Sequence, residues 1–568
     1  MKRWISFTLC LVLGLLLLLC GCLIPAHLRA VEEPVLKEAG RNSTSLVGRG
    51  VSLVHIGQYG AGELILRAAQ SAQLPDTNEL SAAIETQAKK YPASKLWGAS
   101  ISVLKNYFPK APRPADVTFT DFVVREENRQ KALEVLGASK NPSVQALLRS
   151  RLLTNTTTFA PSQAAGGEAF DAAIVVTGLL LELETVSAGL SKEIEKAAAQ
   201  ASQSGNSDAI EQILLDVLSL GQRLDWGQLV TFVGKIDDAG TLHDQADLAR
   251  NSGDQLPVLF SAVELSGDPK AVAQYQKTFH ETGYKDLTTS LRYGAGGVRE
   301  LLRSNRRIYT PEWRQSVARN EPFASLISMG AVWCWRIPVF ALILKWFLYF
   351  AGGFLVAMAL HVGRAPASTL EAPLQVRGFH VAREMLFALG FLLAVLLVSE
   401  PFLAKESPAT ATPPFRLRIP MAGNVVQPEN AKVKTSFMDN TKIVPMGLFF
   451  VLQCLLYISS IVKLAEIRRQ RVGPRMKLKL LENEDHLFDA GLYLGFLGTI
   501  VAFILSSLSA HPTFNLMVAY SSTSFGILFV SVFKIFHLRP VRRHLLLEAD
   551  TEPVATVTTA PAPSLASP

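Results

Sequence analysis

Long apolar runs constrain this chain more than any other feature, because they divide it into two unlike parts. A helix needs about 20 apolar residues to cross the hydrocarbon of a bilayer. Between residues 31 and 330 no run reaches that length. After residue 330 five segments do: Ile337–Leu360, Met385–Leu403, Val444–Val462, Leu487–Leu508 and Phe514–Phe536. We therefore predict an all-α protein, in which a polar helical domain precedes a polytopic membrane domain of about five transmembrane helices.

The composition excludes two simpler classes. A mean hydropathy of +0.24 excludes a disordered chain, which would be poor in apolar residues. A length of 568 residues argues against one soluble domain, because a single core stops growing near about 250–300 residues. The five Cys form no disulfide framework and no metal-binding pair, and no loop clusters a nucleophile with a base. We expect no catalytic residue, no metal and no cofactor, so an enzyme is the least favoured class.

The first 30 residues have the order of a secretory signal peptide. A basic start precedes an apolar run that ends near Ile24, and Ala30 offers a cleavage site. The Leu-Cys-Gly-Cys sequence at 19–22 also resembles a bacterial lipobox, with Cys22 as the lipidated residue. An uncleaved N-terminal anchor is the third interpretation. All three predict that the chain after residue 30 is exported.

Residues 31–330 have the apolar spacing of helices. One long helix is expected over 168–200, and Asp208 can cap another. Shorter amphipathic helices are predicted at 226–236, 255–266, 269–281 and 294–305, and only Val51–Ile56 alternates like a strand. We interpret this region as an exported helical domain, either repeat-like or an irregular bundle, of the kind that binds other proteins.

Two short features at the end of this region leave alternatives open. Gly294–Gly297 precedes a helical stretch and could bind an anion there, but the phosphate-loop residues are absent, which favours a simple turn. A basic run follows, and either a solvated helix face or a contact with lipid headgroups near the first span would explain it. Its residues are Arg299, Arg303, Arg306 and Arg307.

The basic loops predict how the chain is oriented. Segments 465–486 and 538–543 are rich in Lys and Arg and should therefore be cytoplasmic. Because five predicted spans separate residues 31–330 from the C-terminal basic segment, residues 31–330 should lie outside. We expect a multi-pass protein of the bacterial inner membrane, with residues 31–330 periplasmic and the C-terminus cytoplasmic. The net charge of +8 then reports orientation and not a nucleic-acid partner. The predicted segments are 331–364 (first-span region), 383–404 (second span), 405–442 (Pro-rich extracytoplasmic loop), 443–464 (third span), 465–486 (basic loop), 487–537 (final hairpin) and 538–568 (cytoplasmic tail with a disordered end).

Polar and small residues inside the spans are candidates for function or for helix packing. Lys345 is an intramembrane charge that could instead extend toward the headgroups. Small residues at three- or four-residue steps allow helix backbones to approach closely, and hydroxyls in lipid prefer a helix interface or a pore. The candidates of this kind in the last two spans are Gly491, Gly495, Gly498, Thr499, Ser522, Thr523 and Gly526.

The last hairpin, about 487–543, resembles that of the MotA/TolQ/ExbB proton-channel family. The resemblance rests on residues 519–526, which include Thr523, and on the run Leu494-Gly495-Phe496-Leu497-Gly498-Thr499-Ile500. It implies that Thr499 and Thr523 correspond to pore-lining threonines and that the third span corresponds to the family's first helix. The channel carboxylate of the family would fall near Val518, which carries no proton.

Three functions are therefore considered. The favoured hypothesis is a non-catalytic envelope scaffold, or a subunit of a motor-like complex, that binds partners through its exported domain. The alternatives are an ion or proton channel or transporter component that uses the final hairpin, and a membrane-bound enzyme. We expect membrane lipids and other envelope or membrane proteins as partners, an oligomeric state, and no nucleic acid.

The orientation can be tested with reporter fusions at residues 250, 370, 420 and 475. We expect activity from an export-dependent reporter at 250 and 420, and from a cytoplasm-dependent reporter at 370 and 475, because the basic loops stay inside. A fusion at 250 that reports the cytoplasm would contradict the predicted orientation.

Overall fold

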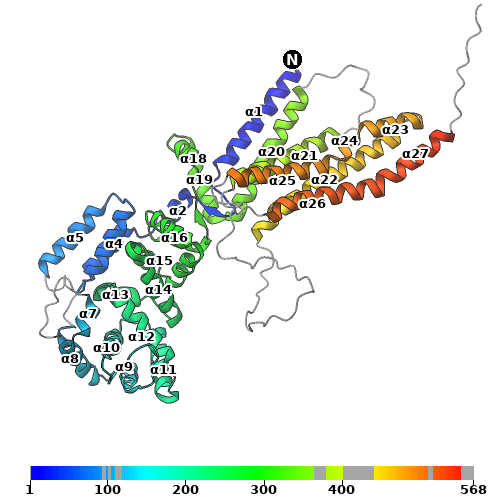
Figure 1. Cartoon of the computed structure of the whole chain (residues 1–568). Coiled ribbons are helices and arrows are strands. Elements are labelled where there is room, and N and C mark those ends of the chain that lie inside the picture. Colours follow the sequence, from blue (N-terminus) through cyan, green and yellow to red (C-terminus); the bar gives the residue numbers. More distant parts are fainter. Residues whose placement is uncertain are drawn as a thin grey trace, which may run out of the picture. The chain divides into compact units, whose positions relative to one another are not determined.

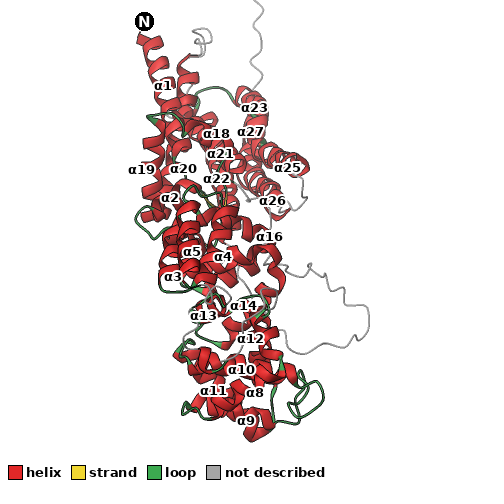
Figure 2. Cartoon of the chain, turned by 90° about the vertical axis from the view of Figure 1, so that its left-hand side faces the viewer, coloured by secondary structure: helices red, strands yellow, loops and turns green. Residues whose placement is uncertain are grey.

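The protein is described by a computed structural model for residues 2–91, 97–99, 104–108, 118–363, 379–400, 440–508 and 516–551. The fold is all-α, as predicted, with one pair of two-residue strands in the described ranges (Figures 1 and 2). The chain forms two compact units. The helical unit is Ala30–Pro338, and the membrane unit combines Met1–Arg29 with Val339–Pro568.

Helices that are one or two apart in sequence pack against each other through most of the helical unit, and α10 and α15 are buried along most of their length. Its elements are β1 (Ala30–Val31), α2 (Glu33–Gly40), α3 (Leu46–His55), α4 (Tyr59–Ser71), α5 (Thr77–Lys90), α7 (Phe119–Val124), α8 (Glu126–Gly137), α9 (Pro142–Arg149), α10 (Glu168–Glu182), α11 (Ala188–Ser204), α12 (Asp208–Gly221), α13 (Trp226–Val233), α14 (Ala239–Ser252), α15 (Leu256–Ser266), α16 (Pro269–Leu291), α17 (Gly294–Ser304), β2 (Arg307–Ile308), α18 (Glu312–Val317) and α19 (Phe323–Arg336).

Three local expectations were wrong, and at the first of them a side-chain cap starts a new helix where the apolar pattern runs on. Residues 168–200 form two helices, since Glu184 adopts a positive φ of 52° and Ser187 caps α11 by accepting the N–H of Leu190. Val51–Ile56 is not a strand, because all but its last residue lies within α3. The N-cap of α12 is Ser207, and Asp208 is the first helical residue.

The two ends of the helical unit are joined to each other. Strand β1 pairs in parallel with β2, with Ala30 opposite Arg307. Directly after β1, Glu32 is fully buried and forms an ion pair with the buried guanidinium of Arg314 on α18. Helix α2 then packs against α17 and α19, the last helices of the unit. The first and last segments of the unit therefore form one closed base.

A buried carboxylate organises the centre of the helical unit. Glu211 on α12 is fully buried, and its oxygens accept the backbone N–H groups of residues 157–159 at 2.5–3.1 Å and the hydroxyl of Ser207. Burial by itself would raise the pKa of Glu211, but these hydrogen bonds lower it below its ordinary value. The charged carboxylate thus holds the segment before α10 against α12.

Within the described residues, the membrane unit contains four helices that are long and apolar enough to span a bilayer, which indicates a multi-pass membrane protein. They are Trp4–Leu23, Pro338–Val362, Phe449–Arg469 and Tyr520–Asp550. The last three overlap the first, third and fifth predicted spans. The second and fourth predicted ranges hold the shorter apolar stretches Glu384–Leu396 and Ala490–Ile500 within the described residues. The predicted loop at 405–439 and tail end at 552–568 lie outside the described residues.

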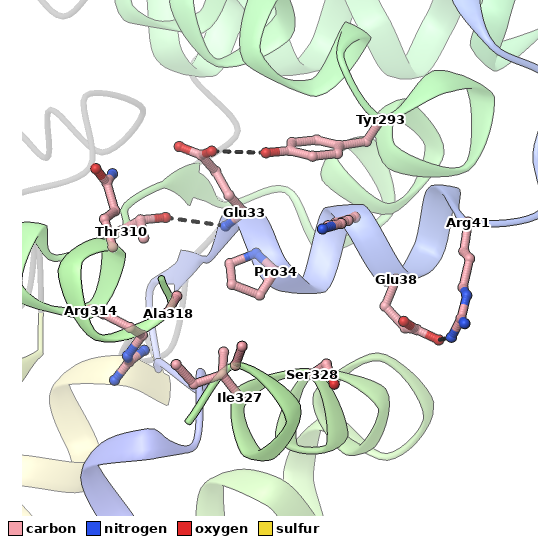
Figure 3. Close-up of a pocket in the computed structure, with 13 residues that line it drawn as sticks. Glu33, Pro34, Glu38, Arg41, Tyr293, Thr310, Arg314, Ala318, Ile327 and Ser328 are labelled. Atoms are coloured by element: carbon pink, nitrogen blue, oxygen red, sulfur yellow. Dashed lines mark hydrogen bonds and ion pairs between the residues drawn. The ribbon is translucent and has the colours of Figure 1, made fainter. Parts of the chain in front are cut away.

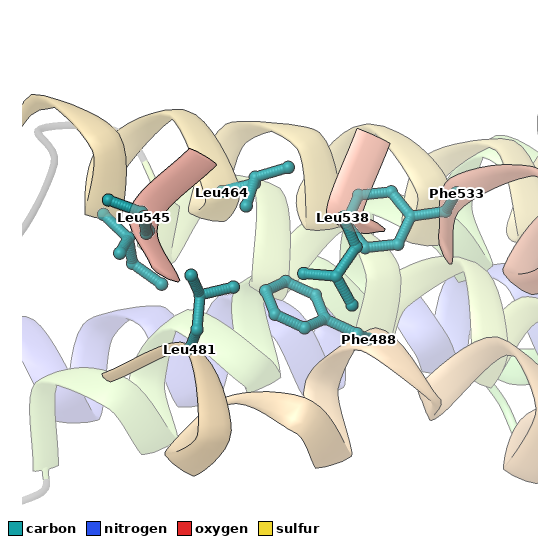
Figure 4. Close-up of a cluster of buried hydrophobic side chains, with 7 residues drawn as sticks. Leu464, Leu481, Phe488, Phe533, Leu538 and Leu545 are labelled. Atoms are coloured by element: carbon teal, nitrogen blue, oxygen red, sulfur yellow. The ribbon is translucent and has the colours of Figure 1, made fainter. Parts of the chain in front are cut away.

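In the described residues, the membrane unit packs around two apolar clusters. One joins Tyr349, Leu392 and Phe449, with Leu18 and Phe525 against it, so helices from both ends of the chain share it. The other lies where α22, α23, α24, α26 and α27 meet, and Figure 4 shows its side chains converging. The elements are α1 (Lys2–Leu23), α20 (Pro338–Gly363), α21 (Phe379–Ser399), α22 (Asn440–Arg469), α23 (Pro474–Asn483), α24 (Asp485–Phe488), α25 (Ala490–Leu508), α26 (Leu516–Phe533), the π-helix η5 (Lys534–Leu538) and α27 (Arg539–Thr551).

Replacing Glu211 with Gln should destabilise the helical unit by about 2 kcal/mol, because several charge-assisted hydrogen bonds weaken together. The wild-type contribution should be full above pH 4.5, the ordinary pKa, and should be lost as the pH falls through the lower pKa of the folded state. Thermal unfolding of the full chain in detergent, followed by circular dichroism, measures both effects. Glu281→Gln, at an exposed site, is the matched control. Equal melting temperatures for both variants would contradict this role.

Candidate functional site

Backbone contact between α25 and α26 builds the candidate site in the membrane unit. A Cβ on Gly495 would lie 2.7 Å from the carbonyl oxygen of Ser522, and one on Gly526 would lie 2.6 Å from that of Gly491. Any larger residue would force the helices apart, so the predicted small-residue spacing does bring these two backbones together. Gly498 faces Phe449 and Ser522 on the same side.

Three hydroxyls gather on one carbonyl at this contact. The hydroxyls of Ser522, Thr523 and Thr499 lie within hydrogen-bond distance of the carbonyl oxygen of Gly495, at 3.0, 3.1 and 3.2 Å. The hydroxyls of Thr499 and Thr523 also lie 2.5 Å from each other. The structure thus unites all three predicted hydroxyl residues in one polar seam. In lipid such bonds satisfy the hydroxyls and hold the helices together.

One residue of this seam was missed from the sequence. Gln453 on α22 is 1% exposed, and its amide nitrogen donates to the carbonyl oxygen of Gly491 at 3.0 Å. A glutamine inside the apolar stretch 444–462 is itself a signal, because an amide in hydrocarbon needs a partner. Gln453 adds a third helix to the α25–α26 contact.

The polar seam carries dipoles and no charge. Thr499 and Thr523 are half-buried, whereas Ser522 is fully buried. Hydroxyl and amide groups can order water or coordinate a cation weakly, but none of these side chains titrates near neutral pH. The family that the hairpin resembles has its channel carboxylate near the position of Val518. The side chain of Val518 lies outside the described residues.

A second polar cluster surrounds Lys345 on α20. The lysine is 1% exposed and its ammonium donates to the carbonyl oxygen of Ala26 at 2.5 Å, so it does not extend toward solvent. Glu400, after α21, accepts the N–H of Leu28 at 2.7 Å and lies 3.6 Å from the imidazole of His27. The cluster therefore holds residues 26–28, which follow α1. Its partners are hundreds of residues apart, which is why spacing did not predict them.

Cys22 lies on the last turn of α1. Its sulfur accepts the hydroxyl of Tyr349 at 3.6 Å and is half-buried. Lipidation at this cysteine stays a prediction.

In the helical unit, α2, α18 and α19 enclose a hollow of about 550 Å³ (Figure 3). Glu33, Lys37 and Arg314 lie among apolar residues such as Ile327 in its wall. The hydroxyl of Tyr293 donates to Glu33 at 2.8 Å, and burial together with this carboxylate raises the tyrosine pKa. Acidic and basic groups are mixed here, so the hollow favours neither anions nor cations.

Comparison with known proteins places the chain in no family. No family model matches it, and neither a curated protein nor a solved structure is similar to it. Within the described ranges, no group of three or more His, Cys, Asp or Glu side chains is arranged to hold a metal ion.

Gly526→Val should disrupt the membrane unit, because the added carbons would overlap the carbonyl of Gly491. Overpacking of this kind costs about 1–3 kcal/mol. Gly447→Val on α22 is the matched control, since a Cβ there meets no atom within 4 Å in the described structure. Size-exclusion chromatography after heating in detergent should show earlier loss of monodisperse protein for Gly526→Val alone. Equal losses would show that the close approach is not required.

Proposed function

We propose that the chain is a non-catalytic scaffold of the bacterial inner membrane, which binds envelope proteins through an exported helical unit. The observation that carries this proposal is the closed base of that unit. Strand pairing between β1 and β2 and the buried Glu32–Arg314 pair join its two ends. Both ends continue within a few residues into candidate membrane spans, since α1 ends at Leu23 and α20 begins at Pro338.

A base of this kind suits a scaffold for a physical reason. Binding costs less conformational entropy when the surface that meets the partner is already held in place. A load applied to the helical unit would be carried by an ion pair and two strands and not by a free linker. The membrane helices would then anchor the unit at two points of the chain.

The same function favours retention of α1 as a membrane helix. A Cβ on Gly14 would lie 3.1 Å from the carbonyl oxygen of Gly352 on α20, so the two helices pack closely. Cleavage after Ala30 would also take away the partners that Lys345 and Glu400 find at residues 26–28. Retention leaves the helical unit outside, because α1 adds one crossing before it. The intact mass of the purified protein tests this, and a mature N-terminus at Val31 or a lipidated Cys22 would contradict it.

A channel is the second candidate, favoured by the hydroxyls of the polar seam and by Gln453. Thr499→Val with Thr523→Val should then abolish ion or proton flux in liposomes, whereas Ser524→Ala, at an exposed site on α26, should not. Wild-type protein that conducts nothing, or a double variant that conducts equally, would contradict this candidate.

The scaffold function predicts discrete partners for the helical unit in cells. A photo-crosslinking residue at Ile56 or Leu152, each 71% exposed, should give defined adducts with envelope proteins. Arg314→Gln should weaken these adducts, because it leaves Glu32 buried without its ion partner and loosens the base. Arg67→Gln, at an exposed arginine of α4, is the control that should leave them unchanged. A folded protein that gives no adduct from exposed positions across the unit would contradict the scaffold.

A further inference from the structure

A second hollow, of about 410 Å³, lies within the helical unit where the end of α2, the start of α17 and the end of α19 meet. Arg41, Arg299 and Arg336 line it together with Trp335. We call it the arginine hollow. The sequence analysis left two interpretations open for Arg299. The structure places two further arginines, from distant segments of the chain, in the same hollow.

Two glycines bring the arginines together. A Cβ on Gly40 would lie 1.9 Å from the carbonyl oxygen of Tyr293, and a Cβ on Gly296 would lie 2.1 Å from that of Ala39. The end of α2 and the first turn of α17 are therefore in backbone contact. Arg41 and Arg299 follow these glycines by one and three residues, so both reach the same hollow.

The helix N-terminus in this wall does not supply the site. Gly294 begins α17, but the N–H of Ala295 donates to the carbonyl oxygen of Thr44 and that of Gly296 donates to the hydroxyl of Ser43. The expected simple turn is instead a helix start whose N–H groups bind the chain itself. An anion in the hollow would have to be held by side chains.

The arginine hollow carries an excess of positive charge. Glu38 is its one acidic residue and lies 3.7 Å from Arg41. Arg299 donates through its Nε to the carbonyl oxygen of Ser266 at 3.2 Å. The side chain of Arg336 makes no ion pair or hydrogen bond with any residue in the described ranges. A guanidinium group can bind a phosphate with two parallel hydrogen bonds when its N–H donors are not used elsewhere.

An exposed apolar stripe leads to the arginine hollow. Leu326, Met329 and Trp333 on α19 are 41%, 50% and 40% exposed, although the opposite face of the helix is buried. Their spacing continues to Arg336 three residues later, so the stripe and the guanidinium share one helix face. A stripe with tryptophan that ends in a basic residue is typical of helices at a membrane surface.

Chain connectivity sets the depth of this site. Arg336 stands two residues before Pro338, where the candidate span of α20 begins. Two residues extend at most about 8 Å, and the headgroup layer of a bilayer is roughly 5–8 Å thick on each side. If α20 spans the membrane from Pro338, the backbone of Arg336 therefore lies close to the level of the lipid phosphates.

We propose that the arginine hollow binds the phosphate of an anionic phospholipid, with the acyl chains beside the stripe on α19. Positive charge next to a span on the exported side runs against the usual charge distribution, which supports a specific role. This site does not depend on the scaffold function, because it requires only that α20 spans the membrane.

Native mass spectrometry of the full chain in detergent tests the proposal, with phosphatidylglycerol, phosphatidylcholine and inorganic phosphate as separate probes. The triple variant Arg41→Gln/Arg299→Gln/Arg336→Gln should bind phosphatidylglycerol about tenfold or more weakly than wild type, because charge-assisted hydrogen bonds are lost. Arg303→Gln is the matched control, since Arg303 lies on the same α17 and pairs with Glu300 outside the hollow.

Each outcome decides the proposal. Selective loss of phosphatidylglycerol binding in the triple variant, with an unchanged melting temperature, supports it. Equal binding by wild type and triple variant would overturn it. Inorganic phosphate that binds as tightly as the lipid would show a free-phosphate site, and phosphatidylcholine that binds equally would show a non-selective apolar surface. Both results would overturn the lipid assignment. If the triple variant unfolds, the single variant Arg336→Gln repeats the comparison, because its side chain holds no other residue in place.

Discussion

The closure of the helical unit on α2 is the constraint on which its other features depend. Helix α2 is the first helix of the unit, yet it packs against α17 and α19, which are among the last. Glycine at positions 40 and 296 permits the backbone contact, and the Glu32–Arg314 pair seals the end beside it. A buried ion pair of this kind adds little net stability, but removal of one partner is costly. The Glu32–Arg314 pair therefore contributes more to the choice of which segments close the unit than to the stability of the closed unit.

The membrane unit obeys a related constraint in a different solvent. Lipid offers no hydrogen-bond partners, so each polar group inside the unit must find one within the protein. Because Gly495 has no side chain, α26 comes close enough for the hydroxyls of Ser522 and Thr523 to reach its carbonyl, which the hydroxyl of Thr499 reaches from within α25. Small residues thus do two things in α25: they shorten the distance between helices and they expose backbone acceptors. Lys345 meets the same demand at the carbonyl of Ala26.

Prediction from the sequence succeeded where the signal was local. Apolar periodicity and run length indicated the all-α class and three of the candidate spans, and glycine spacing indicated the hairpin contact, because its partners are only about one helix apart. It failed where a cap overrides periodicity, as at Ser187, whose side chain starts α11 inside the predicted long helix. It also could not find the contact of Lys345 with Ala26, or the gathering of Arg41, Arg299 and Arg336 around one hollow. Their partners are brought together by the fold, and no spacing in the chain records them.

The pairing of β1 with β2 has a consequence for the order in which the protein is made. The two strands are separated by nearly the whole helical unit, with Ala30 opposite Arg307. Contacts between such distant segments form late, because the entropy of closing the intervening loop must be overcome first. Strand β1 is synthesised long before β2. It therefore stays without its partner strand until the rest of the unit has been synthesised. Neighbouring helices such as α3 and α4 can assemble during this interval. The base of the unit therefore cannot form until β2, near the end of the unit, has been synthesised.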